Sequence, residues 1–407
     1  MSPPSPQPAL ELHALRRTPN ALAPHYSRFR VADRLLLTGH SHQAWPDVAE
    51  AGLLACWADA AEAVDAKWDR AEAIAERVRE GYRRLLGDPA GEIALGASTH
   101  ELVVRLLSTL ELRRRPRVVT TDEEFHSLRR QLDRLSEEGL DVVRVPASPV
   151  ATLAERLAAT VDERTSAVMV SAVLFETARI VPHVAAVVDA CVRHGAELLV
   201  DAYHALGPVP FPIHELGLAT AWVTGGGYKY LQLGEGNAFL RIPEHAAEAR
   251  PVITGWFAEL DDLSGDHGTH AVTYGPGARR FAGATYDPAS HYRAAAVLDF
   301  FEAHGLTPAF LREVAQHQLG RLAAGVDALD LPDAVVTRAR DVPIAALGGF
   351  LALRSPRAGR LQRALADRGV VTDSRGDHLR LGPAPYLADA QLDAAVAALG
   401  EVVPMLD

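Results

Sequence analysis

Cysteine is scarce in this chain of 407 residues, which contains only Cys56 and Cys191. The two do not form a Cys-x-x-Cys motif, and their number and spacing exclude a disulfide framework and a zinc site. We therefore expect no metal centre and a reducing cytoplasm as the compartment. Long apolar runs are also missing, since no stretch of about 18 apolar residues could cross a membrane. The proline-rich first residues lack the pattern of a signal peptide.

Positive charge is in the minority, because 41 lysines and arginines face 52 aspartates and glutamates, giving a net charge of −11. This balance argues against non-specific nucleic-acid binding and against attachment to an anionic membrane surface. Apolar residues make up 48% of the chain, which is ordinary for a globular protein. The length suits one large and one small domain.

Short apolar runs alternate with helical patterns in the middle of the chain. The predicted strands are 93–99, 117–121, 142–145, 167–173, 197–201, 221–224 and 237–241. The predicted helices between them are 127–138, 153–160 and 183–194. This alternation is typical of an α/β fold with a mostly parallel sheet covered by helices on both faces. Ligands of such sheets bind outside the carboxyl ends of the strands.

The flanking segments have different patterns. One helical pattern runs through 47–86, and the glycine-, aspartate- and proline-rich segment 245–290 is predicted to form loops. From residue 291 the pattern indicates a small α+β domain, with strands at 348–354 and 377–381. We expect an N-terminal arm and opening loop over 1–45, a large domain over 46–290 and a small domain over 291–407.

Lys229 is the most informative residue, because it follows three glycines and lies between two tyrosines, Tyr228 and Tyr230. Upstream, Asp201 ends the apolar run Leu198-Leu199-Val200. A lysine that forms a Schiff base and an aspartate that keeps a pyridine nitrogen protonated are what pyridoxal phosphate (PLP) chemistry requires. Taken singly, the two residues also fit a surface lysine in a glycine-rich loop and a carboxylate that caps a helix.

Other residues follow strands and can meet this pair. Ser98 and Thr99 open a helix, where hydroxyl and free backbone N–H groups can bind a phosphate. Phe125 can stack on a pyridine ring, and His204 can bind the cofactor or Asp201. A bare helix cap, a core phenylalanine and a structural histidine are the alternatives at these positions.

Arg375 and Arg380 belong to a segment with strand-like alternation near the C-terminus. An arginine on a strand can hold the α-carboxylate of a substrate with two hydrogen bonds. A surface salt bridge is the alternative interpretation.

From about residue 35 to its end, the chain resembles the class V aminotransferase group of fold-type I PLP enzymes, and kynureninases most of all. Three motifs carry the likeness: Asp201-Ala202-Tyr203-His204, Tyr228-Lys229-Tyr230-Leu231 with its two following glycines, and Leu379-Arg380-Leu381-Gly382-Pro383. The resemblance implies a seven-stranded, mostly parallel sheet in the large domain. It also implies a homodimer with active sites at the subunit interface.

The resemblance assigns roles to individual residues. It makes Lys229 the Schiff-base lysine, Tyr228 a phosphate contact, Phe125 the ring-stacking residue and Arg380 the carboxylate-binding arginine. Trp256 lies in a Gly-Trp motif at the cofactor and substrate, and His40 and Ser41 lie in the opening motif near the active site, on the substrate side.

Two segments depart from kynureninases. The segment Ala284-Thr285-Tyr286 replaces their Ser-Asn-Pro-Pro and is closer to the Gly-Thr of aminotransferases and desulfurases, where the threonine reaches the phosphate of the neighbouring subunit. His40 and His42 replace the asparagine and leucine of the opening motif. By this likeness Thr285 would be a cofactor contact, and the two changes together count against kynurenine as the substrate.

The sequence thus predicts a PLP enzyme acting on an α-amino acid, with kynureninase-like cleavage at the β-carbon. Transamination to a keto acid is the close alternative, and a non-catalytic PLP-fold binding protein is a distant one. A cysteine desulfurase is disfavoured, because no cysteine follows Cys191 to act as its nucleophile.

Overall fold

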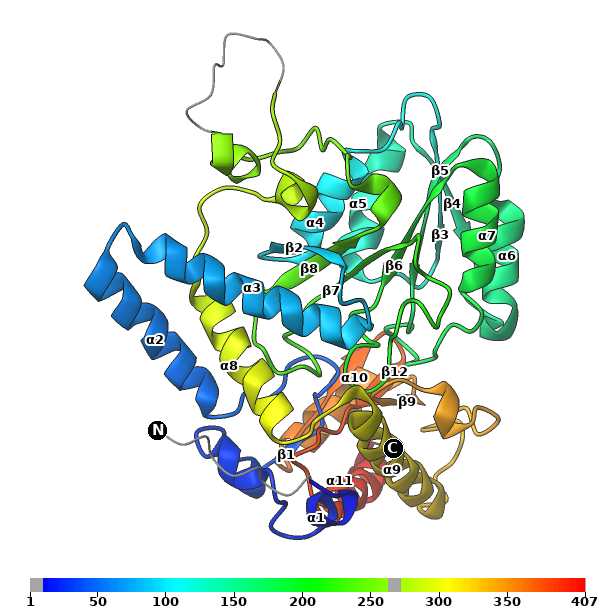
Figure 1. Cartoon of the computed structure of the whole chain (residues 1–407). Helices are drawn as coiled ribbons and strands as arrows, with labels where there is room; N and C mark the ends of the chain where they lie inside the picture. Colours follow the sequence, from blue (N-terminus) through cyan, green and yellow to red (C-terminus); the bar gives the residue numbers. More distant parts are fainter. Residues whose placement is uncertain (1–9, 263–271, 407) are drawn as a thin grey trace.

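A seven-stranded sheet forms the centre of the larger part of the chain in the computed structural model, which describes residues 10–262 and 272–406 (Figure 1). Its strands are β2 (Glu92–Gly96), β3 (Arg117–Thr121), β4 (Asp141–Val145), β5 (Thr165–Ser171), β6 (Glu197–Asp201), β7 (Trp222–Gly225) and β8 (Ala238–Ile242). Their order is β2-β8-β7-β6-β5-β3-β4, and only β8 runs antiparallel to its neighbours. The mostly parallel sheet expected from the sequence is confirmed.

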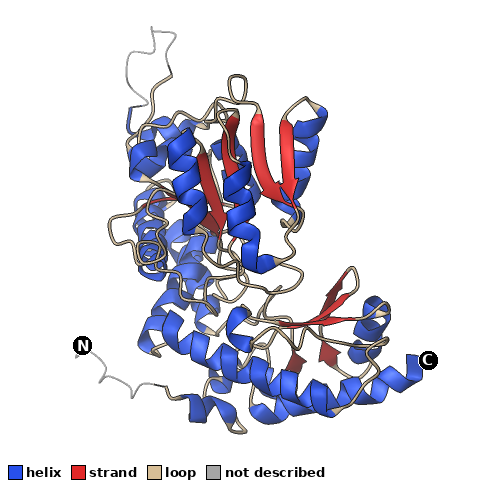
Figure 2. Cartoon of the chain, turned by 90° about the vertical axis from the view of Figure 1, so that its right-hand side faces the viewer, coloured by secondary structure: helices blue, strands red, loops and turns tan. Residues whose placement is uncertain are grey.

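Apolar side chains alternate along these strands and form a core on each face of the sheet. Val118, Leu199 and Trp222 pack with α4 (Thr99–Leu107) and α5 (His126–Glu137). The next residues in two of these strands, Val119 and Val200, belong to the opposite core, with α6 (Leu153–Thr160) and α7 (Ala185–His194). Successive side chains of a strand point to opposite faces, so near-continuous apolar runs produce a sheet covered on both sides (Figure 2).

The helical pattern of 47–86 forms two helices instead of one. α2 (Val48–Ala63) and α3 (Lys67–Leu86) are separated by a turn at Val64, whose φ of 48° is left-handed. The turn folds both helices against α8 (Ala289–Ala303), and Figure 1 shows the three helices side by side. Periodicity did not reveal the break because both helices contain repeated alanine and glutamate, and no proline separates them.

The C-terminal part contains a small antiparallel sheet in the order β11-β12-β9. Its elements are α9 (Pro308–Ala328), β9 (Leu351–Arg354), α10 (Ala358–Ala366), β10 (Val370–Val371), β11 (Asp373–Arg375), β12 (His378–Leu381) and α11 (Asp389–Val402). The two expected strands are present as β9 and β12, whereas the short strands β10 and β11 were not anticipated. The domain boundaries proposed from the sequence remain predictions.

Residues 10–45, where the sequence favours an arm, pack against the C-terminal part of the same chain. The segment contains α1 (Leu12–Arg16) and β1 (Leu35–Leu36), and β1 pairs in parallel with β10. The buried hydroxyl of Tyr26 donates a hydrogen bond of 2.5 Å to Oε1 of Gln232, three residues after Lys229. The start of the chain therefore supports the loop that carries the lysine.

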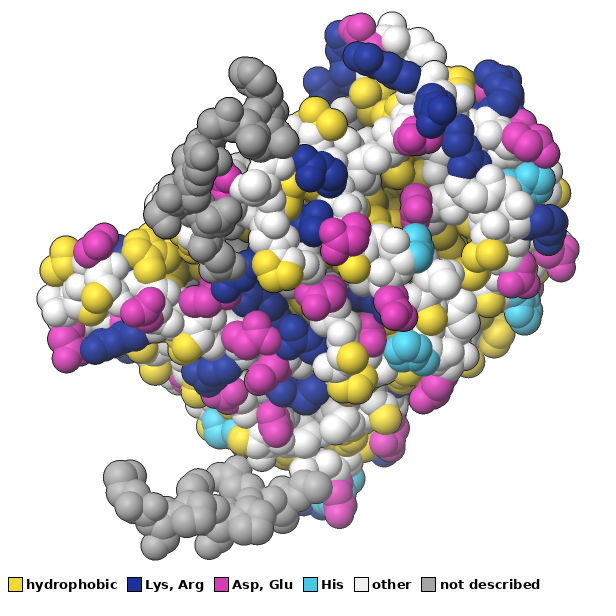
Figure 3. Space-filling model, turned by 45° about the horizontal axis from the view of Figure 1, so that its top comes forward, with side chains coloured by type: hydrophobic (Ala, Val, Ile, Leu, Met, Phe, Trp, Pro, Cys, Tyr) yellow, Lys and Arg dark blue, Asp and Glu magenta, His cyan; other side chains and the backbone are white. Residues whose placement is uncertain are grey.

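The segment 245–290 contains short 3-10 turns at Glu244–Ala246, Trp256–Asp262 and Gly277–Phe281, and residues 263–271 lie outside the described residues. Acidic and basic side chains are interspersed on the face shown in Figure 3. No helix among the described residues is both long enough and apolar enough to cross a membrane.

Replacing Tyr26 by phenylalanine is expected to lower the free energy of unfolding by about 1–3 kcal/mol, because it leaves the buried Gln232 oxygen without this donor. Urea denaturation of the purified protein measures the change. Tyr274→Phe removes a hydroxyl that donates to the Pro251 carbonyl in a more exposed place and serves as the control. Equal stability of Tyr26→Phe and the wild type would contradict the prediction.

Candidate active site

A cavity of about 320 Å³ lies at the carboxyl ends of β5, β6 and β7, where parallel sheets bind ligands. It collects seven of the residues singled out in the sequence: Ser98, Thr99, Phe125, Asp201, His204, Tyr228 and Lys229. The sequence separates these residues by up to 131 positions, and the parallel sheet brings them together. We call this cavity the lysine pocket.

Close packing of side chains against glycine backbone fixes the loop before Lys229. A Cβ on Gly226 would lie 2.5 Å from the Tyr203 hydroxyl, and one on Gly227 would lie 2.5 Å from Asn237 Oδ1. Asn237 Oδ1 accepts from the Gly227 N–H, and its amide nitrogen donates to the carbonyls of Leu233 and Gly234. The glycine run therefore holds Lys229 in place by close approach.

Lys229 is buried, and its Nζ is hydrogen-bonded to Nε2 of His204 at 2.7 Å. Burial lowers the pKa of Lys229 to about 7, with Asp201 acting in the opposite direction and Arg380 adding to the decrease. The pKa of His204 is also well below its usual value, because of burial and the lysine charge. Much of Lys229 is therefore the neutral amine near pH 7, the form that attacks a carbonyl.

Asp201 is a carboxylate that lines the lysine pocket. One oxygen accepts from the Tyr203 N–H at 2.8 Å, and burial raises the pKa of Asp201 above its usual value. Glu124 lies nearby and accepts from the hydroxyls of Ser171 and Thr121, while burial raises its pKa to about 7. A protonated ring nitrogen would supply the cationic partner that Asp201 lacks in the described part of the chain.

The start of α4 forms another wall of the pocket and suits a phosphate. Ser98 caps the helix by accepting from the Glu101 N–H at 3.3 Å. Thr99 Oγ1 is buried and has no hydrogen-bond partner among the described residues. An orphaned hydroxyl at a helix N-terminus fits an anion, since the N–H groups and the helix dipole act in the same direction.

Aromatic rings also line the lysine pocket. Nζ of Lys229 lies 4.9 Å from the ring centre of Phe125 and 4.6 Å from that of Tyr203. Phe125 packs edge-on against Phe175 at 5.7 Å, and Tyr203 lies 4.9 Å from Tyr228. A flat aromatic cofactor with a phosphate at one end and a ring nitrogen at the other fits the residues present.

Arg380 approaches from β12 and is buried. Its Nε and Nη2 bind the two oxygens of Asp373 at 2.8 and 2.5 Å, and Nη1 donates to the carbonyl of Phe175, a pocket residue. Arg375 is more exposed, and its nearest carboxylate is Asp373 at 3.7 Å. The structure thus places Arg380 next to the lysine pocket, where its guanidinium is paired with the carboxylate of Asp373.

His40 and Ser41 lie in the loop after β1. His40 is fully buried and its Nε2 lies 2.7 Å from Asp373 Oδ1. His40 is therefore hydrogen-bonded to the carboxylate that binds Arg380. Ser41 is partly exposed, and its hydroxyl hydrogen-bonds to Nδ1 of His42, whose ring stacks on Tyr228 at 5.2 Å. Neither lines the lysine pocket itself.

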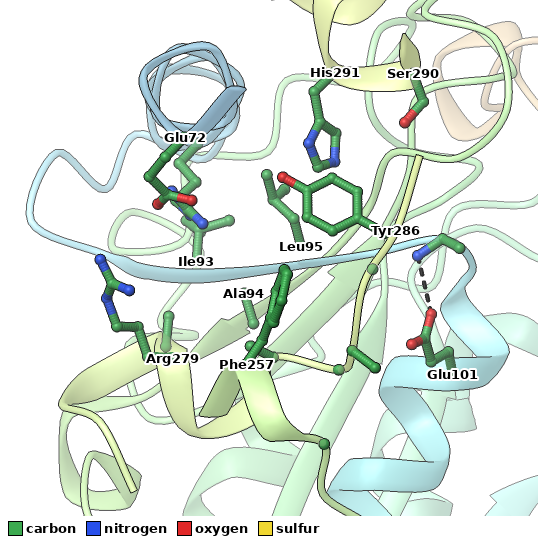
Figure 4. Close-up of a pocket in the computed structure, with 18 of the residues that line it drawn as sticks. Glu72, Ile93, Ala94, Leu95, Glu101, Phe257, Arg279, Tyr286, Ser290 and His291 are labelled. Carbon is green, nitrogen blue, oxygen red and sulfur yellow. Dashed lines mark hydrogen bonds and ion pairs between the residues drawn. The ribbon is translucent and has the colours of Figure 1, made fainter. Parts of the chain in front are cut away.

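Trp256 and Thr285 lie in a second cavity of about 1410 Å³, which we call the large cavity (Figure 4). It shares Ala97, Glu235 and Gly236 with the lysine pocket. Figure 4 shows Tyr286, His291 and Phe257 directed toward one another, and Glu101 bonded to the Ala97 N–H. The structure therefore does not bring Trp256 and Thr285 into contact with the lysine pocket of their own chain.

Three residues of the site were not singled out from the sequence. Tyr203 forms a wall of the lysine pocket, Glu124 lies beside Asp201, and Asp373 holds Arg380. Asp373 faces Arg380 across a hairpin whose two-residue turn is Gly376-Asp377. A glycine-containing two-residue turn between strand-like segments is a hairpin signal that could have located Asp373.

Comparison with known families decides the relationship. The model of the class-V aminotransferases matches residues 56–319, and that of the kynureninase C-terminal domain matches residues 321–399. The chain belongs to the class-V aminotransferase family. Its members are PLP-dependent enzymes, so the cofactor expected from the sequence is confirmed, together with the fold.

Curated relatives of this class-V protein have different activities in their names. An uncharacterized aminotransferase, YcbU, of Bacillus subtilis is 25% identical over 81% of this chain and 84% of its own length. A kynureninase of Deinococcus radiodurans is 27% identical, covering 87% and 83%. Isopenicillin N epimerase of Streptomyces clavuligerus is 26% identical, covering 84% and 87%.

Solved structures show the same fold at low identity. A C-DES mutant with glycine covalently linked to its PLP cofactor has a TM-score of 0.81 at 17% identity, with 93% of this chain and 98% of that one covered. A cysteine desulfurase of Thermococcus onnurineus has a TM-score of 0.75 at 18% identity, with 92% and 95% covered.

The low pKa of Lys229 predicts how cofactor uptake depends on pH. Lys229 is protonated below about pH 7 and neutral above it, so the rate of PLP attachment to apoprotein should rise up to about pH 7 and then level off. An ordinary lysine would give a rate that rises roughly tenfold per pH unit until about pH 10. Stopped-flow absorbance between pH 5.5 and 9.5 measures the rate.

Two controls accompany this measurement. Reaction of PLP with a free alkylamine corrects for titration of the cofactor, and Lys229→Ala should show no visible absorption band of attached cofactor. A rate that continues to climb above pH 9 would contradict a lowered pKa of Lys229.

Proposed function

We propose that this protein is a PLP-dependent enzyme that cleaves an α-amino acid at the β-carbon, as kynureninases do. The observation that carries the proposal is the lowered pKa of Lys229, which is influenced by the charges of Asp201 and Arg380. Arg380 belongs to the part of the chain that matches the kynureninase C-terminal domain. When bound, PLP supplies an electron sink that stabilises negative charge on the substrate α-carbon.

The residues of the lysine pocket divide the work of holding the cofactor. Lys229 would bind the aldehyde carbon, Thr99 and the start of α4 would bind the phosphate, and Phe125 would stack on the ring. Asp201 would keep the proton on the ring nitrogen, since its burial leaves the carboxylate in need of a cationic partner.

Lys229 also serves as the proton carrier. Once a substrate amine has taken its place, the free amine of Lys229 can remove the α-proton and return a proton later, because a pKa of about 7 suits both directions. His204, at 2.7 Å from Nζ, orients the amine. Arg380 is the group proposed to bind the substrate carboxylate.

Transamination is the second candidate function, supported by the relative named an aminotransferase and by Thr285 in place of the kynureninase asparagine. It uses the same lysine chemistry and differs in the need for a keto acid. Desulfurase chemistry is disfavoured, because neither Cys56 nor Cys191 lines the lysine pocket, and burial raises the pKa of Cys191 to about 12. A binding protein without turnover would not require a buried lysine beside a carboxylate.

The reaction is tested by incubating holoenzyme with a panel of amino acids, including L-kynurenine, with and without pyruvate. The proposal predicts release of L-alanine and the cleaved side-chain product, such as anthranilate, without an acceptor. Strict dependence on pyruvate would contradict it and support transamination, and racemisation alone would support epimerase chemistry. Lys229→Ala is the inactive control for each reaction.

We also propose that a second copy of the chain covers the large cavity, so that the enzyme is a homodimer. Exposed apolar side chains surround this cavity: Ile253, Trp256 and Leu260 line it, and Leu54 and Trp57 lie on neighbouring α2. Trp57 is 77% exposed, which favours burial against a partner. Thr285 lies outside its own lysine pocket, a place suited to contact the phosphate in the other subunit.

Mixing two inactive variants tests this arrangement. If Thr285 acts across the interface, Lys229→Ala and Thr285→Ala subunits form heterodimers with one intact site, and about a quarter of wild-type activity should return after subunit exchange. The molecular mass from light scattering checks the dimer. No recovery in a mixture shown to contain heterodimers would place Thr285 in its own subunit's site and contradict the proposal.

A further inference from the structure

His40, Asp373 and Arg380 form a buried chain of hydrogen bonds next to the lysine pocket. His40 is 0% exposed and its Nε2 lies 2.7 Å from Oδ1 of Asp373. Arg380 is 3% exposed and binds both oxygens of the same carboxylate. Burial lowers the pKa of His40 to about 4, so the ring is neutral near pH 7 and Nε2 carries the proton that it donates.

The backbone is built for this chain of bonds. Asp373 on β11 and Arg380 on β12 are directly opposed in the antiparallel hairpin. The loop of His40 is held by a hydrogen bond from the Gly39 N–H to the Gly382 carbonyl at 2.8 Å. A Cβ on Gly382 would lie only 2.1 Å from Nδ1 of His40, so only glycine lets the imidazole occupy this position.

The bonds leave one part of the guanidinium available. Nε and Nη2 are directed at Asp373, and Nη1 at the Phe175 carbonyl. A guanidinium has five N–H donors, so within the part of the chain that the structure describes these three bonds leave two, one on each terminal nitrogen. Those two terminal nitrogens form the fork that binds a carboxylate end-on. The ring of Phe350 lies 5.4 Å from the guanidinium carbon and supports its plane.

We propose that His40 and Asp373 are positioning residues that fix Arg380 so that its two remaining N–H donors face the substrate carboxylate. This inference rests on the proposed function of Arg380 as the carboxylate-binding residue. Asp373 holds one edge of the guanidinium and His40 holds Asp373, which limits rotation of a long side chain. Part of the ordering cost of carboxylate binding is thereby met before the substrate arrives.

An opposite role for Asp373 gives a different result and is separable by experiment. If its carboxylate competed with the substrate for Arg380, removing its charge would strengthen substrate binding. If it positions Arg380, removing its charge releases the guanidinium and weakens binding of carboxylates only.

The test uses holoenzyme and two probes, L-alanine and ethylamine, which differ by the carboxylate. Binding of each is followed through the change in the visible band of the lysine-attached cofactor. Asp373→Asn and His40→Leu should weaken L-alanine binding about tenfold or more and leave ethylamine binding within about twofold of wild type. His40→Gln retains an N–H donor and should recover most of the L-alanine affinity.

A matched cluster elsewhere provides the control variant. Nε2 of His317 lies 2.7 Å from Asp389, whose other contacts include Arg16 and Arg321. His317→Leu removes a comparable bond far from Lys229 in sequence and should leave both probe affinities unchanged. Retention of the cofactor band and a wild-type circular dichroism spectrum show that a variant is folded.

The outcomes separate this inference from the function on which it rests. If Arg380→Ala leaves L-alanine binding unchanged, Arg380 is not the carboxylate residue, and both ideas are overturned. If Arg380→Ala weakens L-alanine binding but Asp373→Asn and His40→Leu do not, only the positioning role is overturned. Tighter L-alanine binding by Asp373→Asn, or equal loss of ethylamine binding, would also overturn it.

Discussion

Burial of the Lys229 amine is the constraint on which the site depends. Within the described part of the chain, the hydrogen-bond partner of its Nζ is His204, a neutral histidine, while the Asp201 carboxylate acts only through its charge. An ammonium group in such a place is costly, so the pKa decreases until the neutral amine is populated near pH 7. The fold therefore produces a nucleophile by withholding solvent and a close counter-ion. The glycine run, Asn237 and Tyr26 keep the lysine loop in this enclosed position.

The buried charges of Asp373 and Arg380 follow the opposite rule, because the two groups form an ion pair. Asp373 lies between His40 and Arg380, and despite burial these hydrogen bonds keep its pKa well below the usual range. A paired arginine is fixed in orientation, whereas an unpaired lysine is tuned in reactivity. Phe175 links the unpaired lysine and the paired arginine. Phe175 lines the lysine pocket, and its carbonyl accepts a hydrogen bond from Arg380.

Much of the fold could be predicted from the sequence, since apolar runs of five to seven residues define strands such as Thr165–Ser171 and Glu197–Asp201. The break between α2 and α3 and the two- or three-residue strands β10 and β11 could not, because short elements are stabilised by neighbours distant in sequence. In the site, the motif residues at or just after the ends of β6 and β7 lie together in the lysine pocket, as expected. Trp256 and Thr285 did not, because they line the large cavity instead of the lysine pocket.

The sequence by itself determined the chemistry that is local: a lysine among glycines, an aspartate ending a buried strand and hydroxyls opening a helix. These signals depend on residue type and short spacing, and the family they indicate was confirmed by comparison. Only the tertiary structure decided that Arg380 is bound by Asp373, seven positions away in the chain, and that Asp373 is bound in turn by His40, 333 positions away. Buried ion pairs depend on which strands and loops meet, and one-dimensional patterns do not record which partner a charge will find.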